Sequence, residues 1–110
     1  MSYNLTPLNV CCAMIAEMKD LGGIARQEAK AGYGWQRGSK YRAAGDLPSY
    51  AQRHMLAYAQ KNRIPLKPEW LIVGAKPVEI QAAREKMLAT GKTPPPFTLP
   101  VNAASEVAAE

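Results

Sequence analysis

The sequence has few of the side chains that most often carry out chemistry. His54 is the single histidine, and the two cysteines are the adjacent Cys11 and Cys12. A lone histidine without clustered carboxylates offers no acid–base pair, and two cysteines are too few for a disulfide framework or a zinc site. We therefore expect no enzymatic activity, no metal and no cofactor. Both cysteines are predicted to be small hydrophobic residues of the core, and His54 a partly buried structural residue.

Long hydrophobic runs are also lacking. No segment approaches the roughly 18 consecutive apolar residues that a membrane-spanning helix needs, and the start of the chain has no basic region of the kind that opens a signal peptide. We expect a cytoplasmic protein that makes no membrane contact. With 110 residues, 47% of them hydrophobic and 21% charged, the chain has the size and composition of one globular domain.

Positive charge is concentrated in the middle of the chain. Residues 26–67 contain nine of the 14 lysines and arginines but only two acidic residues, Glu28 and Asp46. This segment therefore carries a formal charge of +7 (nine minus two), and because the whole chain is +5, the remainder carries −2. A basic centre in an otherwise mildly acidic chain is typical of a surface that meets a polyanion. The alternative is a solvated face whose cations only serve solubility.

The first half of the chain shows helical spacing of apolar residues. Thr6 and Pro7 are suited to begin a helix over 7–21, which a glycine pair should end. Two shorter helices are expected over 24–31 and 35–44, the second one weakened by a glycine in its interior.

Three more helices are predicted in the second half. The first is opened by Asp46, has Pro48 in its first turn and fades near Asn62; the second begins at Pro68; the third begins at Pro77 and is closed by Gly91. Their expected apolar positions are Ala51, Met55, Leu56, Ala59, Trp70, Leu71, Val73, Val78, Ile80, Ala83, Met87 and Leu88. The predicted fold is all-α, a compact bundle of five or six short helices over residues 1–91. A Pro-rich, flexible C-terminal tail is expected over 92–110.

The glycines between the predicted central helices have a recurrent spacing. Gly22 and Gly23 are followed after eight residues by Gly32, after eight more by Tyr41, and then by a short basic stretch that ends at Pro48. In this spacing, and in the helix and the Ile-Pro-Leu sequence that follow, residues 8–73 resemble the helix-turn-helix domains of phage Cro and repressor proteins.

This resemblance implies a small, sequence-specific DNA-binding transcriptional regulator of phage or mobile-element type, with double-stranded DNA as its partner. The helix over 35–44 would enter the major groove. The base-reading candidates are then Gln36, Arg37, Ser39 and Lys40. The candidates for phosphate contacts are Arg26, Lys30, Arg42 and Arg53. Trp35 and Tyr41 are expected to be core or rim aromatics rather than groups that stack on bases.

A second function remains open, that of a small protein-binding inhibitor or adaptor that uses a repressor-like scaffold to grip a nucleic-acid-processing protein. A regular helix over 35–44 would favour DNA reading, whereas an irregular loop there would favour protein binding. Regulators of this kind usually bind DNA as dimers. The candidate homodimer face is Val78, Ile80, Met87 and Leu88. The alternative for these four residues is packing against the first helix.

Overall fold

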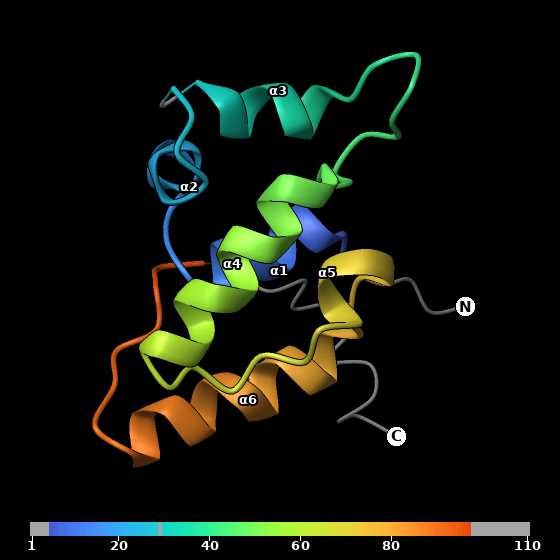
Figure 1. The fold of residues 1–110 in the computed structure, drawn as a ribbon. Coiled ribbons are helices and arrows are strands. Elements are labelled where there is room, and N and C mark those ends of the chain that lie inside the picture. The colour runs from blue at the N-terminus through green and yellow to red at the C-terminus, as the bar shows by residue number, and fades with distance from the viewer. Residues whose placement is uncertain (1–4, 29, 98–110) are drawn as a thin grey trace.

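The computed structural model describes residues 5–28 and 30–97. Within these ranges the chain forms six helices and no strand, which confirms the predicted all-α class. The helices are α1 (Pro7–Met14), α2 (Met18–Ile24), α3 (Ala31–Arg37), α4 (Ser49–Lys61), α5 (Trp70–Val73) and α6 (Pro77–Ala89). In Figure 1, α3 lies at one end of the molecule and α6 at the other, with α1 and α4 between them. None of the described helices is long and apolar enough to cross a membrane.

The short helix α1 forms the centre of the core. It begins as the sequence predicts, because the Thr6 side chain accepts a hydrogen bond from the Asn9 N–H at 3.2 Å and Pro7 occupies the first turn. Seven of its eight residues are buried, and it packs against α2, α3, α5 and α6. Cys11 and Cys12 are among the buried residues, as expected.

The prediction of one continuous helix over 7–21 is wrong. The first helix ends at Met14, the chain is extended at Glu17, and α2 begins at Met18. The break is visible in the backbone: the N–H groups of Ile15 and Ala16 both donate to the Cys11 carbonyl, at 2.8 and 3.2 Å, and the extended Glu17 then interrupts the helical hydrogen bonding.

The expected helix over 24–31 is also absent. The pair Gly22 and Gly23 lies inside α2 instead of ending the preceding helix, and residues 25–27 form a turn. Helix α3 starts only at Ala31. The sequence signal was misread because a glycine pair near the end of a short helix resembles a helix stop.

The second half of the chain follows the prediction more closely. Helix α6 has the expected extent, whereas α4 begins at Ser49 and not at the predicted Asp46, with Pro48 as its extended N-cap. The centres of their predicted inward stripes are buried. These buried positions are Ala51, Met55 and Ala59 in α4 and Ile80, Ala83 and Met87 in α6. Ile80 and Met87 are thus core residues, and α6 packs on α1.

Three of the expected apolar positions lie on the surface. Val73, Val78 and Leu88 have exposed fractions of 66%, 57% and 60%. The four-residue helix α5 buries Trp70 and Leu71 and turns its other two residues outward. Spacing alone did not reveal which apolar positions of α5 and α6 face the core.

The described part of the predicted tail is attached to the bundle. Arg84 on α6 donates from Nη1 to the carbonyl oxygens of Ala13 at 2.6 Å and Pro95 at 2.8 Å. Phe97 packs partly buried against the core cluster. The remainder of the predicted tail lies outside the described residues.

Candidate nucleic-acid interface

Helices α2 and α3 form a closely packed pair joined by a turn. In Figure 1, α2 is seen along its axis and α3 runs across it at the surface of the bundle. Gly32 lies where the helices approach most tightly, because a Cβ at this position would be 2.7 Å from the carbonyl oxygen of Met18. Glycine at position 32 therefore permits the crossing. This short helix–turn–helix arrangement uses different residues from those predicted.

The turn that follows α2 places an arginine in a left-handed conformation. The Gln27 N–H donates to the Gly22 carbonyl at 2.7 Å and the Arg26 N–H to the Gly23 carbonyl at 3.0 Å. These two bonds form a Schellman closure, whose left-handed position is usually occupied by glycine. Here Arg26 occupies it with φ 62°, and its side chain is exposed. The Arg26 guanidinium is therefore exposed to solvent in the turn between α2 and α3.

The helix expected over 35–44 is wrong, because α3 ends at Arg37. Gly38 caps the helix with φ 78°, and a Cβ there would lie 2.7 Å from the Ala44 nitrogen. The chain then makes a tight turn in which the Ser39 N–H donates to the Arg42 carbonyl at 2.8 Å. A helix cannot continue through this backbone, because Gly38 has a positive φ and the chain folds back so that Ala44 packs against it.

The turn after α3 returns to the core at Gly45. Its N–H donates to the Trp35 carbonyl at 2.8 Å, and its carbonyl accepts from the Leu8 N–H at 2.9 Å. Trp35 itself is buried, as expected, and meets Tyr50 edge to face at 6.4 Å between ring centroids. Both ends of the turn are therefore fixed to the bundle while residues 39–42 project from it.

The predicted base-reading residues are divided between these two elements. Gln36 and Arg37 lie in the last turn of α3, whereas Ser39 and Lys40 belong to the following turn. All four are exposed. The structure therefore brings them to one region of the chain, but not onto the single helical face that the sequence predicted.

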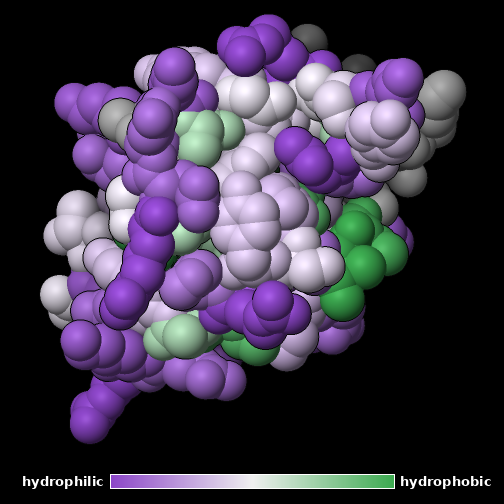
Figure 2. All heavy atoms as spheres, turned by 45° about the horizontal axis from the view of Figure 1, so that its top comes forward, coloured by the Kyte–Doolittle hydropathy of each residue, from purple (hydrophilic) through white to green (hydrophobic). Residues whose placement is uncertain are grey.

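The predicted phosphate-contact residues flank α3 on both sides. Arg26 and Lys30 precede the helix, and Arg42 follows it, while Arg53 lies exposed on α4. Lys30 approaches Glu28 at 3.4 Å, which is the only ion pair among the described residues, and both side chains are largely exposed. Arg42 is half-buried, and its Nε has no hydrogen-bond partner in the described structure. Figure 2, which brings this end of the molecule forward, shows a mainly hydrophilic surface.

Sequence reasoning missed two exposed tyrosines in this region. Tyr41, expected in the core or at its rim, is 86% exposed at the tip of the turn, with the Lys40 ammonium 5.3 Å from its ring centroid. Tyr33 on α3 is 44% exposed. The available signal was the Gly-Ser-Lys sequence, which is typical of a turn and removes the helical register that would have buried Tyr41.

The cysteines are not poised for nucleophilic chemistry. Burial raises the pKa of Cys12 to about 11 and that of Cys11 further, with the adjacent Cys12 adding to the effect at Cys11. Both thiols are therefore protonated at neutral pH, where the thiolate would be the reactive form. In the described part of the chain, no group of three or more histidine, cysteine or acidic side chains is placed to hold a metal ion.

Comparison with known proteins gave no match to a family model, a curated protein or a solved structure.

Proposed function

We propose that this chain is a small DNA-binding regulator that contacts double-stranded DNA with α3 and the turn behind it. The observation that carries the proposal is the placement of exposed cations before and after a surface helix that crosses α2. Arg26 and Lys30 precede α3, whereas Arg37 and Lys40 are at or beyond its end. Because these cations have almost no acidic partners, phosphate groups are their natural counterions.

The short α3 changes the expected mode of binding. A seven-residue helix presents Tyr33, Gln36 and Arg37, and the turn adds Lys40 and Tyr41. We expect the helix to enter the major groove and the turn to contact the adjacent backbone. Of the sequence-based candidates, Gln36 and Arg37 remain the proposed base-reading residues, while Lys40 becomes a proposed phosphate contact.

The first prediction concerns salt dependence. Replacing both Arg37 and Lys40 with alanine should weaken binding to a labelled mixed-sequence duplex and reduce the log–log salt slope by about two. A mixed-sequence duplex offers Arg37 no matched base, so both cations pair with phosphates there, and each lost pair removes about one unit of slope. Fluorescence anisotropy at several salt concentrations measures this slope. The matched control replaces Lys61 and Lys86, which are exposed elsewhere and carry the same charge. Equal effects of the two double variants would argue against an α3 interface and for diffuse attraction.

The irregular backbone over 38–48 also favours the second function, that of a protein-binding adaptor. An exposed, aromatic and basic turn can insert into an acidic surface of another protein without entering a DNA groove. The duplex titration separates the two functions. No binding at low salt would exclude DNA as the partner of this +7 segment, and the same Arg37 and Lys40 variant would then be used to identify a protein contact.

A further inference from the structure

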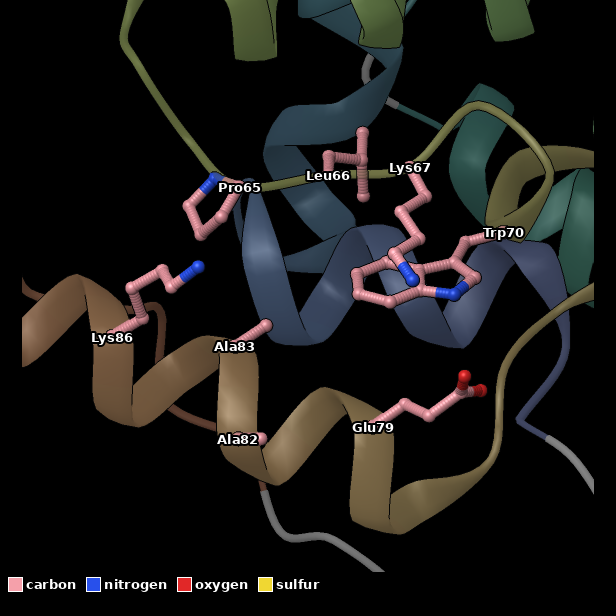
Figure 3. A pocket seen from close by; sticks show the side chains of 8 residues that line it. All are labelled: Pro65, Leu66, Lys67, Trp70, Glu79, Ala82, Ala83 and Lys86. Atoms are coloured by element: carbon pink, nitrogen blue, oxygen red, sulfur yellow. The ribbon is translucent and has the colours of Figure 1, made fainter.

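A groove lies at the opposite end of the molecule from α3, between α6 and the chain that joins α4 to α5. It has a volume of about 390 Å³. Figure 3 shows the extended connector on one side and α6 on the other, with the Trp70 ring between them. The lining residues are Pro65, Leu66, Lys67, Trp70, Glu79, Ala82, Ala83 and Lys86.

The space exists because α6 presents small residues toward the connector. Glu79, Ala82, Ala83 and Lys86 are spaced at i, i+3, i+4 and i+7, so they share one face of the helix. The two alanines occupy the centre of this face, while the charged residues lie toward its two ends (Figure 3). A larger side chain at either alanine would fill the groove from within.

Two lysines and one glutamate surround the apolar floor of the groove, which is formed by the two alanines. Lys67 on the connector and Lys86 on α6 form no ion pair among the described residues. Glu79 is already engaged, since its carboxylate accepts a hydrogen bond from the Lys76 N–H at 3.1 Å and caps α6. The Lys67 ammonium lies 5.8 Å from the Trp70 ring centroid. A ligand in the groove therefore meets apolar contacts together with two cations that are free to pair.

We propose that this groove binds an acidic peptide segment of a partner protein. An aliphatic or aromatic side chain of the peptide lies on Ala82 and Ala83, and its flanking carboxylates pair with Lys67 and Lys86. Nucleic acid fits less well, because Trp70 is only 6% exposed and leaves no open ring face for a base.

This docking surface is independent of the proposed DNA contact. Figure 1 shows α3 and α6 at opposite ends of the bundle, so DNA and peptide can be held at the same time. If the chain is an adaptor, the groove is the place at which it binds its partner, and the partner is recognised through an acidic peptide segment. The proposal does not require that the chain binds DNA.

The test uses three N-acetylated, C-amidated hexapeptides that share a central Leu-Phe pair and carry glutamate, serine or lysine at all other positions. Each is titrated into the ¹⁵N-labelled full-length chain. We expect the glutamate peptide to shift the backbone amides of Ala82 and Ala83 and the indole N–H of Trp70, and to bind more tightly than the other two. Equal binding of the three peptides, or no shift with any of them at millimolar concentration, overturns the proposal.

Charge reversal supplies the control. The double variant Lys67→Glu and Lys86→Glu should weaken binding of the glutamate peptide by about tenfold and favour the lysine peptide instead, because two exposed ion pairs are replaced by repulsion. Lys40→Glu, which lies beside α3, should leave peptide binding unchanged and weaken duplex binding. A duplex that shifts Ala82 and Ala83 would identify the groove as a nucleic-acid surface and overturn the peptide assignment.

Discussion

Two arginines occupy backbone positions at which helices usually place glycine. Helices α2, α4 and α6 each end in a residue with left-handed backbone, namely Arg26 with φ 62°, Arg63 with φ 58° and Gly91 with φ 85°. A left-handed conformation costs a residue other than glycine about 1–2 kcal/mol. Arg26 and Arg63 therefore reduce stability for the same reason, but only Arg26 is part of the proposed DNA interface.

The same substitution at the two arginines should have the same effect on stability but different effects on DNA binding. Arg26→Gly and Arg63→Gly should each raise the free energy of unfolding by about 1 kcal/mol, because glycine adopts the left-handed conformation without strain. Urea denaturation measures this gain. Only Arg26→Gly should weaken duplex binding, since Arg63 follows the far end of α4. If both variants bound DNA like the unaltered chain, Arg26 would have no role at the interface.

At the scale of the element, α3 contains two glycines with different surroundings, and only one of them lies at the crossing with α2. A Cβ at Gly32 would lie 2.7 Å from the Met18 carbonyl oxygen, whereas a Cβ at Gly34 would meet only the mobile end of Arg37 at 4.0 Å. The first glycine allows two helices to touch. The second one only lowers the helical propensity of α3.

The two alanine variants should therefore have opposite effects. Gly34→Ala should stabilise the chain by up to about 1 kcal/mol through helix propensity and should keep duplex affinity. Gly32→Ala should destabilise it by about 1–3 kcal/mol, because backbone atoms would have to shift, and should weaken duplex binding as α3 moves. Thermal unfolding followed by circular dichroism measures both. A neutral Gly32→Ala would contradict the close packing of α2 and α3.

At the scale of the whole molecule, Arg84 joins segments that are far apart in the chain. Its guanidinium bonds the carbonyl of Ala13 in the last turn of α1 and the carbonyl of Pro95 after α6. The last carbonyls of a helix lack partners within the helix, and arginine can supply them. Partial burial lowers the pKa of Arg84, but guanidinium remains charged at neutral pH.

Arg84→Met should therefore destabilise the chain by about 2–3 kcal/mol, because two carbonyls lose a charged donor while the length of the side chain is kept. Chemical denaturation with tryptophan fluorescence measures this loss. Lys86→Met on the exposed side of α6 is the matched control and should change stability by less than about 0.5 kcal/mol. Similar losses for both variants would mean that charge, not the two hydrogen bonds, is responsible.

Elements with strong local signals could be predicted from the sequence. Helices α4 and α6 have regular apolar stripes, a proline at or next to their starts and clear ends, so their buried faces, the extent of α6 and the end of α4 were predictable. The N-terminal cap at Thr6 was predictable for the same reason. By contrast, Val73 at the end of α5 and Val78 in the first turn of α6 are apolar but exposed. Their exposure depends on which neighbouring elements cover them.

The candidate site combines both kinds of information. Its residue types and the concentration of positive charge follow from local composition, which the chain carries in any conformation. The course of the backbone through them does not, since it depends on contacts between distant residues. Gly32 against Met18 lets α3 pack on α2, and Gly38 against Ala44 accompanies the end of α3 at Arg37. Gly45 against Thr6 returns the chain to the core. These contacts form only when the bundle is packed, and they alone place the cations on both sides of a surface helix.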